Sequence, residues 1–148
     1  MESPQTEAWW LFREILKDWN GLSGKDKTFC PEDQKKLQSA LERRFKREPL
    51  AYISGEKGFW RDDFKVNSST LIPRADSEAL IELFLELVPD KKITARLLDL
   101  GTGTGCLLLT LLGEYSQLYG VGADIVPEAV LLAKENATHL GLLERSDF

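Results

Sequence analysis

The sequence predicts a mixed α/β fold, and three features of the chain predict it. A short apolar run, Leu97 to Leu100, reads as a buried strand and is followed by a glycine-dense turn and an apolar run, Leu107 to Leu112, that opens a helix. A second strand, Tyr119 to Ala123, precedes a helix that begins at Pro127. Two amphipathic helices occupy the first 50 residues. Strands that alternate with helices indicate a parallel sheet.

The first expected helix runs from Thr6 to Asn20. Apolar residues recur in it at spacings of three and four, which predicts one broad packing face; they are Trp9, Phe12, Ile15, Leu16 and Trp19. A base-stacking surface is the alternative interpretation of these aromatic residues, and the helical spacing favours packing. Asn20 and Gly21 both tolerate the left-handed conformation and are expected to end the helix.

The second expected helix begins at Pro31, with acidic residues in its first turn. Its predicted buried face consists of Leu37, Ala40, Leu41 and Phe45. Its last turn is basic, with Arg43, Arg44, Lys46 and Arg47. This basic cluster is a candidate contact for RNA or an acidic partner, but a solvated helix end that matches the helix dipole is favoured. Pro49 stops the helix.

The middle of the chain predicts a β-hairpin and a third helix. Two short runs, Lys57 to Trp60 and Phe64 to Val66, flank the polar residues 61–63 and are typical of a hairpin. A polar connector and an extended segment, 71–74, follow, and a domain boundary is expected here. The next helix is expected to be capped by Asp76 or Ser77 and to run to about Val88. Its predicted apolar stripe consists of Leu80, Ile81, Phe84, Leu87 and Val88.

The last predicted helix runs from Pro127 to about Leu140, with Gly141 ending it. Its residues expected to point inward are Ala129, Val130, Ala133, Ala137 and Leu140. Residues 144–148 are expected to begin a third strand.

The glycine-dense turn has the pattern Asp-x-Gly-x-Gly-x-Gly, from Asp99 to Gly105. Glycines let the backbone approach a ligand closely or take positive φ, and the following helix points its free N–H groups at the same place. Cys106 replaces the third glycine of the dinucleotide fingerprint, and no Lys-Ser or Lys-Thr follows for a triphosphate. Asp124 ends the second strand 23 residues after Gly101, close to the roughly 20 expected for an acid that binds ribose hydroxyls. The pattern predicts a nucleoside cofactor site. A tight turn with an incidental surface aspartate is the alternative.

Composition excludes several classes of function. The net charge of −5 provides no basic field for nucleic acid, and no apolar stretch approaches the roughly 18 residues of a membrane span. No signal peptide is recognisable, and two distant cysteines favour a reduced, cytoplasmic setting. His139 is the only histidine, so the chain has too few histidines for a histidine-based metal site and offers a single candidate base for a Ser–His relay. No metal is expected.

Several segments occur together, in order, with the motifs of one family. They are Glu48–Glu56, Phe64–Asn67, Leu71–Arg74, Leu98–Cys106 and Asp124–Ala129. In this combination the chain resembles the HemK/PrmC family, the glutamine methyltransferases that modify peptide chain release factors. The resemblance extends over nearly the whole chain and is closest from Glu48 onward.

The resemblance implies three parts. Residues 1–54 would form a small helical domain that recognises the release factor, residues 55–72 a β-hairpin linker, and residues 73–148 the first half of a doubly wound, Rossmann-like domain. This last part would bind S-adenosyl-L-methionine as the methyl donor.

The resemblance also implies roles for single residues of the cofactor site. Asp124 would accept hydrogen bonds from the ribose hydroxyls, and Ile125 would pack on the adenine. Asp99 would orient the loop, meet the methionine amine or serve only as a strand end, and Arg74 would line the site or start a helix. The residues that would approach the methionine and ribose are Gly101, Thr102, Gly103, Thr104 and Gly105.

The family's Asn-Pro-Pro-Tyr motif, which holds the substrate amide, does not occur in these 148 residues. We therefore expect no catalytic residue here, no methyl transfer by the chain alone, a truncated gene product, and self-association through the exposed apolar surface of an incomplete domain. Two alternatives remain open: a non-catalytic fragment that binds a protein partner through its helical domain, and a fragment of an adenine-type nucleic-acid methyltransferase. The negative net charge argues against the latter.

Overall fold

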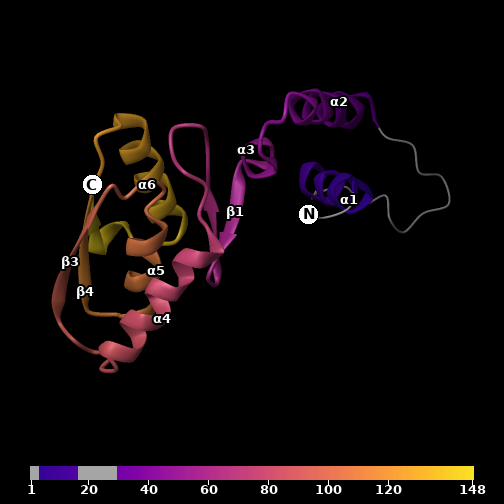
Figure 1. Cartoon of the computed structure of the whole chain (residues 1–148). Coiled ribbons are helices and arrows are strands. Elements are labelled where there is room, and N and C mark those ends of the chain that lie inside the picture. The colour runs from indigo at the N-terminus through magenta and orange to yellow at the C-terminus, as the bar shows by residue number, and fades with distance from the viewer. Residues whose placement is uncertain (1–3, 17–29) are drawn as a thin grey trace. The chain divides into compact units, whose positions relative to one another are not determined.

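The structure is a computed structural model that describes residues 4–16 and 30–148 (Figure 1). The chain divides into two compact units, Met1–Ser54 and Gly55–Phe148.

The N-terminal unit contains α1 (Pro4–Ile15), α2 (Pro31–Phe45) and the short α3 (Leu50–Ser54). Its small core consists of Leu11, Ala40 and Ile53, with Ile15 and Leu50 packed against them. The predicted face of the first helix is therefore only partly correct. Leu16 is buried, but Trp9 is 54% exposed, because so small a core accommodates only the stripe centred on Leu11. Trp19 of that predicted face and the expected helix end at Asn20 and Gly21 lie outside the described residues.

Helix α2 begins at Pro31 as predicted, but its buried face is narrower than expected. Ala40 is buried, whereas Leu41 is 49% and Phe45 91% exposed, so the prediction for these two residues is wrong. In the described residues, the core of this unit meets α2 at Ala40, on the side that faces Leu11 and Ile53.

The basic end of α2 contacts its own unit. Arg43 donates to both carboxylate oxygens of Glu48, at 2.8 and 2.5 Å, and to the backbone carbonyl of Tyr52 at 2.9 Å. Arg44 pairs with Glu7 of α1. Two of the four basic side chains therefore join the elements of the helical unit, while Lys46 and Arg47 are exposed.

The C-terminal unit begins with the predicted hairpin, formed by β1 (Glu56–Phe59) and β2 (Asp62–Lys65). The turn is shorter than expected, because Asp62 and Asp63 belong to β2 and only two residues connect the strands. Phe59 and Phe64 contact edge to face, with ring centroids 6.2 Å apart, and both are buried in the main core. The hairpin, predicted as a linker, thus lies in the same compact unit as the parallel sheet.

The parallel sheet has the order β3-β4-β5, formed by Ala95–Leu100, Leu118–Ala123 and Ser146–Asp147. The elements between and around the strands are the 3₁₀ turn η2 (Ala75–Ser77), α4 (Glu78–Leu87), α5 (Cys106–Glu114), α6 (Pro127–His139) and the 3₁₀ turn η3 (Leu143–Arg145). This arrangement confirms the predicted α/β class and the third strand.

The three long helices of this unit, α4, α5 and α6, lie on the same side of the sheet (Figure 1). In the part of the chain that the structure describes, no helix covers the other face, on which Leu98 is 66% and Leu100 75% exposed. The expectation of a buried strand at 97–100 is therefore wrong for two of its residues, since parallel strands are buried on both faces only where helices cover both. Self-association through this surface stays a prediction.

The main core forms around α5, whose Leu108, Leu109 and Leu112 are buried, as its apolar character predicts. Helix α4 buries Ile81 completely, but Leu80 and Leu87 of its predicted stripe are 56% and 70% exposed. Both side chains line an open, mostly apolar groove between α4, α5 and β3, which leaves them accessible to solvent.

The start of α4 and the buried face of α6 also differ from expectation. Of the two predicted caps, Ser77 stands at the N-cap position of α4, but its side chain makes no capping hydrogen bond. Asp76 lies in the 3₁₀ turn η2, which leads into the helix. In α6, Ala129, Ala133 and Ala137 are buried as predicted, and the buried Asn136 was not predicted.

Candidate functional site

The glycine loop between β3 and α5 is attached to the neighbouring strand. Gly101, Gly103 and Gly105 have φ of 76°, 55° and 78°, a region that residues with a Cβ rarely adopt. The N–H groups of Gly101 and Thr102 donate to the carbonyl of Ala123, the last residue of β4, at 2.8 and 3.0 Å. The loop is therefore fixed at the carboxyl ends of two parallel strands, where open α/β sheets bind ligands.

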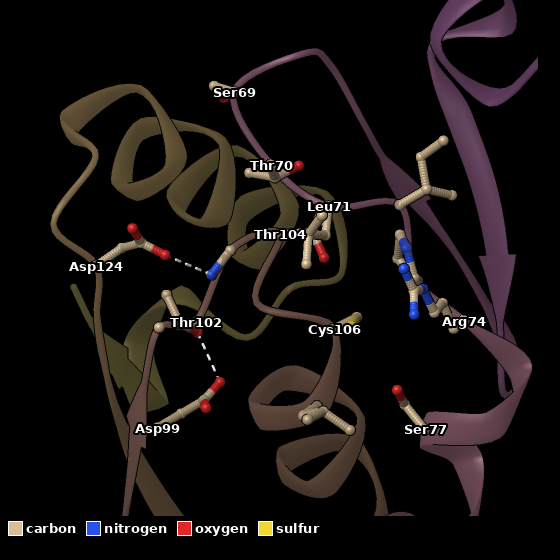
Figure 2. Close-up of a pocket in the computed structure, with 15 residues that line it drawn as sticks. Ser69, Thr70, Leu71, Arg74, Ser77, Asp99, Thr102, Thr104, Cys106 and Asp124 are labelled. Atoms are coloured by element: carbon tan, nitrogen blue, oxygen red, sulfur yellow. Dashed lines mark hydrogen bonds between the residues drawn. The ribbon is translucent and has the colours of Figure 1, made fainter. Parts of the chain in front are cut away.

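Two aspartates support the loop from these strand ends (Figure 2). Asp99 accepts a 2.8 Å hydrogen bond from the hydroxyl of Thr102. Asp124 accepts one from the N–H of Gly103 at 2.9 Å through Oδ2, and one from the N–H of Val126 at 3.0 Å through Oδ1. Each oxygen of Asp124 keeps acceptor capacity for a further donor.

The charge on Asp124 is stabilised by these contacts. The backbone N–H groups of Val126 and Gly103 hold the pKa of the Asp124 carboxyl below its ordinary value. The group is therefore ionised at neutral pH, and an ionised carboxylate is an acceptor only. It is suited to bind hydroxyl or ammonium donors of a ligand and unsuited to bind a phosphate.

A cavity of about 450 Å³ lies between the glycine loop and the segment 69–74. Figure 2 shows Asp124 and Thr102 on one side of it and Arg74 and Ser77 on the other. The residues that line it are Ser69, Thr70, Leu71, Ile72, Pro73, Arg74, Ser77, Asp99, Gly101, Thr102, Gly103, Thr104, Cys106, Leu107 and Asp124.

Of the nine residues predicted for the cofactor site, the structure brings seven together around the cavity. They are Arg74, Asp99, Gly101, Thr102, Gly103, Thr104 and Asp124. Gly105 lies beneath the loop, where an added Cβ would come within 3.0 Å of Leu109 and 3.4 Å of Ala133, so close helix packing explains this glycine. Ile125 is 97% exposed and does not line the cavity, and its contact with an adenine ring stays a prediction.

Sequence reasoning missed several lining residues. Ser69 and Thr70 belong to the polar connector, which carried no signal beyond its composition, whereas Leu71 stands in the segment that the family resemblance had already marked. Cys106 also lines the cavity, and burial raises the pKa of its thiol, so that this group is neutral.

In residues 4–16 and 30–148, no three or more His, Cys, Asp and Glu side chains are grouped so as to hold a metal ion. Among the helices described there, none combines the length and apolar character that crossing a membrane requires.

Comparisons with known proteins give similar sequences along the whole chain. Residues 1–55 match the family model described as the PrmC N-terminal domain. The release factor glutamine methyltransferase of Rhodospirillum rubrum is 40% identical over 150 residues, which cover 100% of this chain and 46% of that protein. That of Vibrio cholerae is 46% identical over 143 residues, covering 95% of this chain and 49% of that protein. The chain thus spans about half the length of the curated relatives it matches.

One solved structure, an SAM-dependent methyltransferase from Geobacter sulfurreducens in complex with S-adenosyl-L-homocysteine, is 28% identical. The match covers 51% of this chain and 28% of that chain, with a TM-score of 0.41.

Proposed function

Since this chain belongs to the PrmC family by sequence, we propose that it takes part in the S-adenosylmethionine-dependent methylation of a glutamine side chain in peptide chain release factors. Its curated relatives are named for that reaction. The observation that carries the proposal is the pairing of a positive-φ glycine loop with an ionised Asp124 at one edge of a cavity.

The residues around the cavity fit this methyl donor. A volume of about 450 Å³ lies within the roughly 300–1,000 Å³ of small-ligand sites. A Cβ added at Gly101 would meet no atom within 4 Å, so the glycine leaves open space beside the backbone. Asp124 has acceptor capacity for ribose hydroxyls, and the carboxylate of Asp99 could bind the methionine ammonium.

The donor, when bound, supplies an electrophilic methyl group on a sulfonium. We propose that this chain's part in the reaction is to bind and orient that donor. The glycine loop and Asp99 hold its methionine and ribose portions, Asp124 fixes the ribose, and Arg74 lines the opposite wall. A neutral glutamine amide is a poor nucleophile, so placing the two reactants accounts for much of such a rate enhancement. That the chain alone transfers no methyl group stays a prediction.

We also propose that the helical unit, Met1–Ser54, provides the surface for the release factor. It contains nearly all of the residues that match the PrmC N-terminal domain, and its exposed Leu41 and Phe45 leave apolar surface available to a protein partner. On the same ground we propose a cytoplasmic location, because release factors act in translation.

Titration of the full chain with S-adenosylmethionine in a calorimeter tests the donor site. We expect saturable heat for the wild type and a binding constant at least about tenfold weaker for Asp124→Ala, because hydrogen bonds to a charged acceptor contribute about 1.5–3 kcal/mol. The matched control is Asp90→Ala, which removes a carboxylate from the surface turn before β3 and leaves the cavity intact. Absence of saturable binding, or equal affinity of Asp124→Ala and the wild type, would contradict the proposal.

Incubation with a release factor and labelled S-adenosylmethionine tests the reaction itself. No labelled glutamine is expected from this chain alone. Labelled glutamine would support the proposed reaction and overturn the expectation that the chain is inactive by itself.

A further inference from the structure

We propose that Asn136 is a positioning residue of the donor site. It would set the spacing between the two walls of the cavity, the glycine loop and the segment 69–74, without touching the donor itself. The inference rests on the proposed function, since its consequence for binding is measured with S-adenosylmethionine. Asn136 lies on α6 and is completely buried, yet it does not line the cavity.

The amide of Asn136 makes three hydrogen bonds to two distant segments. Its Nδ2 donates to the carbonyl of Thr104 at 2.9 Å and to the carbonyl of Lys65 at 3.1 Å. Its Oδ1 accepts from the N–H of Lys65 at 2.8 Å. Both amide hydrogens and the oxygen are therefore used, and one side chain connects α6, the glycine loop and β2.

The two segments joined by Asn136 lead into opposite walls of the cavity. Thr104 belongs to the glycine loop and lines the cavity itself. Lys65 ends β2, and the chain that follows it supplies the lining segment 69–74. The walls meet closely beyond this bridge, because a Cβ placed on Gly103 would lie only 3.9 Å from the Cβ of Thr70.

Packing alone does not explain an asparagine at this position. The rest of the buried face of α6 is apolar, with Ala129, Leu132, Ala133 and Ala137. Burial of an amide side chain is unfavourable unless its hydrogen bonds are made. The three hydrogen bonds described above compensate for the burial of Asn136. These bonds fix backbone groups of the loop and of β2 rather than other side chains, as expected of a residue that sets the distance between segments.

The test compares Asn136→Asp with Tyr115→Phe in the full chain. Aspartate keeps the size of asparagine and an acceptor for the Lys65 N–H, but it removes both donors to the carbonyls of Thr104 and Lys65. Tyr115→Phe is the matched control, because it also removes a buried hydrogen bond, from the phenol to the carbonyl of Val88 at 2.6 Å, and Tyr115 does not line the cavity. Circular dichroism first identifies a temperature at which both variants are folded.

We expect S-adenosylmethionine to bind Asn136→Asp about tenfold more weakly than it binds Tyr115→Phe, because the variant loses the two donated hydrogen bonds that hold the glycine loop and β2. Amide hydrogen exchange without ligand should accelerate in Asn136→Asp at both 65–72 and 101–105. Exchange that accelerates at Lys65 alone, together with an affinity equal to that of the control, would overturn the inference.

A measurement on the wild type keeps the inference testable if Asn136→Asp does not fold. Coupling between two sites is reciprocal, so added S-adenosylmethionine should slow exchange of the Lys65 N–H, although Lys65 does not line the cavity. Binding without such protection would overturn the inference. If the wild type does not bind S-adenosylmethionine, the proposed function fails, and the exchange pattern of Asn136→Asp still decides whether the walls are coupled.

Discussion

Replacement of Gly122 by alanine tests how closely β4 approaches the glycine loop. A Cβ at this position would lie 2.9 Å from the hydroxyl oxygen of Thr102 and 2.6 and 2.7 Å from two ring carbons of Phe148. Since ordinary contacts begin near 3.4 Å, the hydroxyl would have to move by about 0.5 Å and the ring by close to 1 Å.

The two neighbours of the new methyl group differ in how easily they yield. The ring of Phe148 is only half-buried and can turn away. Thr102 is only 6% exposed, its N–H donates to Ala123, and its hydroxyl donates to Asp99 at 2.8 Å, so its movement breaks the contact with Asp99. Overpacking of this kind costs about 1–3 kcal/mol, and we expect Gly122→Ala to lose about 2 kcal/mol of unfolding free energy.

Urea unfolding followed by circular dichroism measures this effect. With a denaturant slope of about 1–3 kcal/mol per molar, the midpoint should fall by roughly 1 M. The matched control is Gly113→Ala in α5, where an added Cβ meets no atom within 4 Å. Because alanine forms helices better than glycine, this variant should gain about 0.5–1 kcal/mol of unfolding free energy. A midpoint for Gly122→Ala equal to or above that of the wild type would refute the close approach of β4 to Thr102.

Two further predictions concern charged groups. Glu114 accepts from the indole N–H of Trp60 at 2.9 Å and from Lys91 at 3.2 Å, and these contacts, that of Trp60 first, hold its pKa below the ordinary value. The stability that the ionised Glu114 contributes is therefore complete above the pKa of a glutamate in the unfolded chain, about 4.3, and is lost as pH falls through its lower pKa in the folded chain. The difference in Tm between the wild type and Glu114→Gln should therefore shrink below about pH 4. A difference in Tm that is constant from pH 3 to 7 would contradict this. Arg43→Lys should lower the protection of the helical unit from amide hydrogen exchange, because an ammonium cannot reproduce the two-pronged contact of the Arg43 guanidinium with the Glu48 carboxylate. The control Lys46→Ala, at an exposed position, should leave this protection unchanged. Equal protection in both variants would argue against a structural role for the Arg43–Glu48 contact.

The strand–turn–helix at the centre of the C-terminal unit could be predicted from sequence because its signals are local. Glycines at alternate positions, a short apolar strand before them and an aspartate after the next strand do not depend on the rest of the fold. The hairpin and the helix starts at Pro31 and Pro127 were predictable for the same reason, since β-runs and proline act on the nearest residues.

Burial was less predictable, because it depends on which elements meet. Phe45 and Leu98 belong to apolar patterns, yet both are exposed, since no element in the described residues covers them. Asn136 shows the opposite case, in which a polar residue of α6 is buried because β2 and the glycine loop bring backbone groups to it. Ile125 follows Asp124 directly, but its side chain lies outside the cavity.

A crystal structure of the chain with S-adenosylmethionine bound tests the proposed donor site most directly. We expect the ribose hydroxyls within hydrogen-bond distance of the Asp124 carboxylate and the methionine portion beside the backbone of Gly101 and Gly103. A structure in which the ligand lies elsewhere, with the glycine loop empty and Asp124 facing solvent, would contradict the proposal.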